Sequence, residues 1–206
     1  MKIIAHRTTS GLYPPNSIQS LLFLVDHGVS AIEFDVCKSS SGKNVVAHPG
    51  LIERGMLDVS TPFKDFLGLC YSKCLDVFVD IKFTDLKFDR SFLRSVMETI
   101  LEVGIGKQTV VISRSGRVLA QFKDTVATGC IMSEIKPESS CPWDLLLIPI
   151  ITFQEYVDTL GNDTSRLVVT DVDKSNFEIT QGHNLFAIMT NNAIELQALM
   201  RERRAS

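Results

Sequence analysis

The chain has 206 residues, of which 45% are hydrophobic and 22% are charged, a composition typical of a folded protein with one sizeable core and not of a disordered tail. Its 21 Lys and Arg residues and 24 Asp and Glu residues give a formal net charge of −3. A weakly acidic chain without a basic block argues against a dedicated nucleic-acid binder, and its apolar runs are too short to predict a transmembrane segment.

Short β-branched segments alternate with helical patterns along the whole chain. The predicted strands are Lys2–Arg7, Ala31–Val36, Lys43–His48, Asp76–Lys82, Gln108–Ser113, Ala127–Met132, Asp144–Ile151, Arg166–Asp171 and Leu185–Thr190. The predicted helices are Ser17–His27, Pro62–Tyr71, Arg90–Val103, Arg117–Lys123, Thr152–Leu160 and Asn192–Arg203, with Thr61 as the N-cap of the second. Several strands are almost entirely apolar, as expected of parallel strands that are covered on both faces.

This alternation, with about eight core strands, is typical of a closed (β/α) barrel or of an open doubly wound sheet. No glycine-rich phosphate loop follows any predicted strand, so nothing favours a nucleotide-binding sheet. No linker or repeat divides the chain. We therefore predict an α/β fold, a TIM-type (β/α)8 barrel, in a single domain over residues 1–206.

Charged and histidine side chains gather at the ends of the early strands. They are His6 and Arg7 in the first predicted strand, Glu33 and Asp35 in the second, His48 in the third, and Asp80 and Lys82 in the fourth. Each pair alone is most often a solvated surface, but parallel barrels place their active sites at the carboxyl ends of their strands. Their coincidence at consecutive strand ends therefore predicts one site.

Carboxylates that point into a barrel mouth repel one another unless a cation joins them. The set Glu33, Asp35 and Asp80 contains no thiolate, so it favours a hard divalent cation, Mg²⁺ or Ca²⁺. The five cysteines of the chain include no CxxC pair, which is typical of reduced thiols, and we expect a cytoplasmic protein.

The remaining residues of the set suggest what the site would do. His6 and His48 can divide general base and general acid catalysis near neutral pH. Arg7 and Lys82 supply positive charge for an anionic substrate, for which a phosphodiester is the natural candidate. Arg114 follows another strand and could also reach the barrel mouth and contact a phosphate.

Five fragments of the first 82 residues form a pattern. They are Ile-Ile-Ala-His-Arg at 3–7, Pro-Pro-Asn-Ser at 14–17, Ala-Ile-Glu-Phe-Asp-Val at 31–36, Val-Val-Ala-His at 45–48 and Val-Asp-Ile-Lys at 79–82. In order and spacing this pattern resembles the glycerophosphodiester phosphodiesterase family. The resemblance implies a TIM-type barrel that hydrolyses phosphodiesters with a divalent metal ion and releases an alcohol and glycerol phosphate.

The resemblance also implies roles for the site residues. Metal binding falls to Glu33, Asp35 and Asp80, and acid–base catalysis falls to His6 and His48. In such enzymes a substrate hydroxyl next to the phosphate attacks phosphorus, and water then opens the resulting cyclic phosphate. The sequence does not decide which histidine is the base, nor does it fix the oligomeric state.

Departures from the family pattern keep two alternatives open. Thr8 stands where the family has Gly, Asp80 stands where it has Glu, and Pro49–Thr61 is much shorter than the subdomain that the family inserts there. The Asp ligand and the short insertion are also similar to the sphingomyelinase D and phospholipase D toxin relatives, which implies a lysophospholipid substrate. The other alternative is a barrel that no longer catalyses and serves as a binding module.

Overall fold

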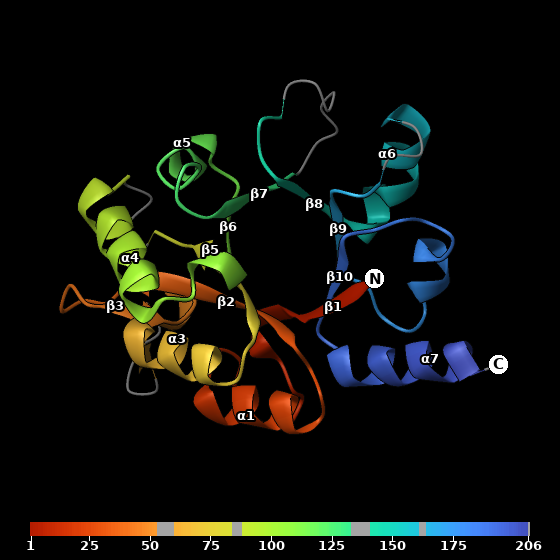
Figure 1. Cartoon of the computed structure of the whole chain (residues 1–206), viewed down its shortest axis with the longest axis horizontal. Coiled ribbons are helices and arrows are strands. Elements are labelled where there is room, and N and C mark those ends of the chain that lie inside the picture. Colours follow the sequence, from red (N-terminus) through yellow and green to blue (C-terminus); the bar gives the residue numbers. More distant parts are fainter. Residues whose placement is uncertain (53–59, 84–87, 133–140, 161–163, 206) are drawn as a thin grey trace.

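The computed structural model describes residues 1–52, 60–83, 88–132, 141–160 and 164–205, and it contains a closed barrel of eight parallel strands. The barrel strands are β1 (Lys2–Ala5), β2 (Ala31–Lys38), β5 (Asp76–Ile81), β6 (Thr109–Ser113), β7 (Ala127–Ile131), β8 (Leu145–Pro149), β9 (Leu167–Thr170) and β10 (Ala187–Thr190). β1 pairs in parallel with both β10 and β2, which closes the barrel. Figure 1 looks along the barrel, with the helices outside it. The predicted (β/α)8 barrel is confirmed.

Helices follow most of the barrel strands. They are α1 (Ile18–Asp26), α2 (Pro49–Ile52), α3 (Phe63–Ser72), α4 (Arg90–Val103), α5 (Gly116–Leu119), α6 (Phe153–Leu160) and α7 (Ala193–Ala205), and a 3₁₀ turn (His6–Thr8) follows β1. α1 begins where the Ser17 hydroxyl accepts a hydrogen bond from the Ser20 amide. None of the helices in the described ranges is long and apolar enough to cross a membrane.

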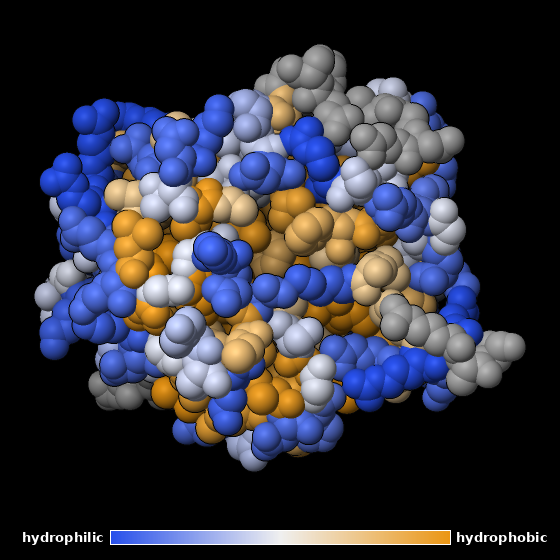
Figure 2. All heavy atoms as spheres, viewed as in Figure 1, coloured by the Kyte–Doolittle hydropathy of each residue, from blue (hydrophilic) through white to orange (hydrophobic). Residues whose placement is uncertain are grey.

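Side chains alternate between two apolar layers along the barrel strands. Ala31 and Phe78 belong to the cluster inside the barrel, whereas Ile32 and Val77 belong to the larger cluster between the barrel and its helices. Figure 2 shows, in the view of Figure 1, apolar side chains in the middle of this face and hydrophilic ones around its edge. Positions 33 and 35 lie on the same face of β2 as Ala31, and position 80 lies on the same face of β5 as Phe78, so their side chains point into the barrel.

The strand predicted at Lys43–His48 is confirmed over a shorter range as β3 (Asn44–Val46), which pairs antiparallel with β2 and with β4 (Thr61–Pro62) and lies outside the barrel. The N-cap predicted at Thr61 is wrong. Thr61 belongs to β4, and Pro62 is the N-cap of α3 without a side-chain hydrogen bond.

Two further expectations concern loops. The helix predicted at Arg117–Lys123 is the single turn α5, because turns replace its second half. The shortened insertion at Pro49–Thr61 falls mostly on residues 53–59, outside the described residues.

Candidate active site

Three buried carboxylates meet inside the mouth of the barrel. β2 and β5 pair in parallel with Asp35 opposite Asp80, and Glu33 lies one inward-facing position earlier on β2. Oxygens of the three groups lie within 4.8 Å of one another, and the residues are only 1%, 1% and 6% exposed for Glu33, Asp35 and Asp80. The sequence prediction that these carboxylates converge is thus met by the geometry.

Two cations and an amide surround the carboxylates. The Lys82 ammonium donates to Asp80 and lies 3.5 Å from Asp35 Oδ1, and Arg7 Nε lies 3.3 Å from Asp35 Oδ2. The Asn16 side chain donates to Asp35 Oδ2 at 3.0 Å and accepts from the Asp35 amide at 3.2 Å. Arg7 and Lys82 are therefore held by the cluster itself, and Asn16 fixes the plane of the Asp35 carboxylate.

A left-handed turn after β1 shapes one side of the cluster. Arg7 and Thr8 have φ of 51° and 49°, a region that favours glycine. This turn directs the Arg7 amide at Glu33, to which it donates at 2.7 Å. Thr8, which stands where the resembling family has Gly, is fully buried, and its carbonyl accepts from the Ser20 hydroxyl. The packing around the turn holds a conformation that costs about 1 kcal/mol or more for a residue other than glycine.

The electrostatics of the cluster favour protons or a cation. Burial, together with repulsion from Asp35 and Asp80, raises the pKa of Glu33 well above its usual range. Burial raises the pKa of Asp80 to about 6, although Lys82 opposes the shift. Burial lowers the pKa of Lys82, but attraction to Asp80 and Asp35 outweighs it, and the net shift is upward.

The residues present fit a hard divalent cation. Asp35 Oδ1 is buried and accepts no hydrogen bond within the described part of the chain, where the Lys82 ammonium approaches it only to 3.5 Å. The possible ligands are carboxylate oxygens, which Mg²⁺ and Ca²⁺ prefer. Glu33, Asp35 and Asp80 could hold such an ion.

His6 stands beside the cluster with a defined orientation. Its Nδ1 lies 3.0 Å from Asn191 Oδ1, and its Nε2 lies 3.9 Å from Glu33 Oε2. The amide oxygen of Asn191 accepts a hydrogen bond, so the proton of the neutral ring is on Nδ1 and the lone pair of Nε2 faces the cluster. Burial lowers the pKa of His6, which favours the neutral ring.

His48 lies after β3 and not at the end of a barrel strand, so the idea that both histidines end consecutive barrel strands is wrong. The Ala47 amide nevertheless donates to the Asp35 carbonyl, and His48 directly follows Ala47 in the chain. His48 Nδ1 accepts from the Gly50 amide at 3.2 Å, so the neutral ring carries its proton on Nε2.

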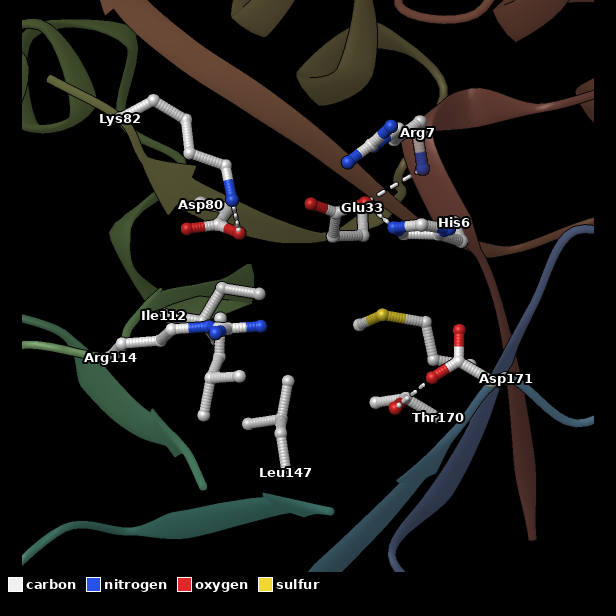
Figure 3. Close-up of a pocket in the computed structure, with 12 residues that line it drawn as sticks. His6, Arg7, Glu33, Asp80, Lys82, Ile112, Arg114, Leu147, Thr170 and Asp171 are labelled. Atoms are coloured by element: carbon white, nitrogen blue, oxygen red, sulfur yellow. Dashed lines mark hydrogen bonds and ion pairs between the residues drawn. The ribbon is translucent and has the colours of Figure 1, made fainter. Parts of the chain in front are cut away.

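A cavity of about 240 Å³ opens over the carboxylates (Figure 3). Its lining includes five of the residues predicted for the site, which are His6, Arg7, Glu33, Asp80 and Lys82, whereas His48 and Asp35 do not line it. The lining also includes Arg114, Thr170, Asp171 and the apolar residues Ile112, Ile131, Leu147 and Met189. Asp171 follows β9, so its position after a strand was the one signal in the sequence that could have indicated it.

Comparison with known proteins agrees with this geometry. Residues 6–87 match the sequence model of the glycerophosphoryl diester phosphodiesterase family. The match covers less than half of the chain. The matched segment contains every residue predicted for the site from His6 to Lys82. No curated protein sequence is significantly similar to the chain.

Solved structures named as glycerophosphodiester phosphodiesterases share the fold of this chain. One from Parabacteroides distasonis has a TM-score of 0.79 at 17% identity and covers 98% of each chain. One from Thermotoga maritima has a TM-score of 0.71 at 18% identity, covering 96% of this chain and 97% of the other. An Oleispira antarctica phosphodiesterase, solved with the product sn-glycerol-3-phosphate, has a TM-score of 0.74 at 16% identity, covering 98% of this chain and 97% of the other.

Asn16 offers a test of the site. Asn16→Ala removes two hydrogen bonds to buried Asp35 and places alanine at a φ of 59°, so we expect a loss of about 1 to 3 kcal/mol in the free energy of unfolding. Urea denaturation measures it. Asn44→Ala, which removes an exposed hydrogen bond that the side-chain amide donates to the Ser95 hydroxyl, serves as the control and should change stability much less. Equal losses in the two variants would contradict the role given to Asn16.

Proposed function

We propose that the protein is a metal-dependent phosphodiester hydrolase that cleaves a glycerophosphodiester to an alcohol and glycerol phosphate. The observation that carries the proposal is the cluster of Glu33, Asp35 and Asp80, buried at the barrel mouth beneath a polar cavity. A divalent cation bound by these carboxylates would act as a Lewis acid toward oxygens of the substrate.

The neighbouring cations would bind the substrate. Arg7 and Lys82 line the cavity next to the carboxylates, and their charges oppose the negative charge that develops on the phosphoryl oxygens. Because both are already held by Asp35 or Asp80, they would meet the phosphate without first having to become ordered.

The two histidines would divide the proton transfers. The Nε2 lone pair of His6 would take the proton of the substrate hydroxyl as its oxygen attacks phosphorus. The bond from phosphorus to the leaving oxygen breaks, and His48, with its proton on Nε2, would protonate that oxygen. The cyclic phosphate that forms is then opened by water, with the histidines in reversed roles.

The test is ³¹P NMR of the purified protein with glycerophosphocholine and a lysophospholipid, each in Mg²⁺, in Ca²⁺ and in EDTA. We expect the glycerophosphocholine signal to be lost only with a divalent ion, with glycerol phosphate as the final product. A transient cyclic phosphate would support attack by the substrate hydroxyl.

Two other outcomes would replace this proposal. Consumption of the lysophospholipid alone would favour the sphingomyelinase D-like alternative, which the Asp at position 80 also fits. If neither diester is consumed with either ion, hydrolysis of these substrates is refuted, and the barrel is better regarded as a binding module.

A further inference from the structure

Arg114 differs from the other cations of the cavity. Arg7 and Lys82 both form ion pairs with the carboxylate cluster. Arg114, which directly follows β6, also lines the cavity, and within the described ranges no carboxylate forms an ion pair with it. Its charge is therefore available to a ligand.

The surroundings of Arg114 separate it from the cluster. In Figure 3 its guanidinium extends into the cavity beside Ile112, with Leu147 below it and with Glu33 and His6 across the open space. Arg114 is itself exposed, so an anionic group can reach its guanidinium directly.

A second charge limits what the cavity accepts. The Asp171 carboxylate lines the opposite side, held by a hydrogen bond from Thr170 at 3.0 Å. Asp171 disfavours a ligand group with two negative charges, such as a phosphomonoester. A ligand group with one negative charge is therefore favoured, and the Arg114 guanidinium can form a bidentate pair with a single carboxylate.

We propose that Arg114 binds a carboxylate on the alcohol part of the substrate, so that the preferred diesters carry this second anion in addition to the phosphodiester. The inference rests on the proposed function, because it specifies the substrate of the same cavity. Arg114 then determines specificity, while the phosphodiester itself lies against the cluster.

The experiment compares glycerophosphoserine with glycerophosphoethanolamine, which differ only by a carboxylate. We expect kcat/KM of the protein to be about tenfold or more higher for glycerophosphoserine. Arg114→Gln should bring the ratio of the two values close to unity by lowering only the value for glycerophosphoserine. Arg94→Gln, the same change at an exposed position of α4, is the matched control and should leave the ratio unchanged.

A binding measurement separates this inference from the proposed function. Calorimetric titration of His6→Ala with each diester in Mg²⁺ should show the same preference, lost when Arg114→Gln is added. If the protein hydrolyses neither diester but the binding preference is present, the proposed function fails and the inference stands. Equal affinities of the protein for the two diesters would overturn the inference. An Arg114→Gln variant that weakens the binding of both diesters equally would also overturn it, because Arg114 would then bind the phosphodiester that they share.

Discussion

Glu33→Gln is expected to abolish metal-dependent hydrolysis and, at the same time, to stabilise the metal-free protein. Glutamine keeps the shape of the side chain and an oxygen that can accept the hydrogen bond from the Arg7 amide. It removes one of three charges that repel one another in a buried cluster. We expect the free energy of unfolding in EDTA to rise by about 1 to 2 kcal/mol, and kcat/KM to fall by about a hundredfold or more.

The pH dependence of stability follows from the same repulsion. The pKa of Asp80 in the folded protein is raised to about 6, and that of Glu33 is raised as well. The folded state therefore binds more protons than the unfolded state above about pH 4, and the metal-free protein loses stability as the pH rises through about 6. Mg²⁺ or Ca²⁺ should reverse this loss, because the ion takes the place of the protons.

Thermal unfolding between pH 4.5 and 8, in EDTA and with each metal ion, measures both effects. The control is Glu98→Gln on the exposed side of α4, which should change neither the stability nor its pH dependence. A Glu33→Gln variant that is less stable than the parent in EDTA, and retains its activity, would refute the role of Glu33.

His6→Ala and His48→Ala are expected to lower kcat by about 10²-fold to 10⁴-fold while metal affinity is kept. The leaving group distinguishes the two roles. With a nitrophenol diester of glycerol, whose leaving oxygen needs no proton, His48→Ala should recover most of its activity and His6→Ala should not.

Steady-state kinetics with the alkyl and nitrophenyl diesters provide this comparison, and calorimetry checks metal binding. His27→Ala is the control, since His27 is exposed and bonds the Phe23 carbonyl of its own helix. Recovery of His6→Ala instead of His48→Ala would exchange the roles, and full activity of both variants would refute them.

The barrel could be predicted from the sequence because its signals are local and repeated. Apolar strands alternate with helices, and the inner parity of β2 and β5 follows directly from Glu-x-Asp and from Asp80. The strand at 43–48 shows the limit of this approach. A β-branched segment looks the same whether it pairs inside the barrel or antiparallel at its edge, and only long-range pairing decides.

Part of the site could be predicted because side chains alternate regularly along a strand. The face of a strand to which Glu33 or Lys82 belongs follows from its position in that alternation. Partners from distant loops could not be placed this way. Asn191, which orients His6, is 185 positions away from it, and the left-handed turn at Arg7 and Thr8 uses residues whose preferences oppose that conformation.

We expect Glu33, Asp35 and Asp80 to bind a divalent cation at the mouth of the barrel. Anomalous diffraction from a crystal soaked in Mn²⁺, which takes similar oxygen ligands, tests it most directly. We predict one strong peak within bonding distance of oxygens from all three carboxylates, and no peak there in a crystal of Asp35→Asn. A strong peak elsewhere, with no peak beside the three carboxylates, would contradict the proposed metal site.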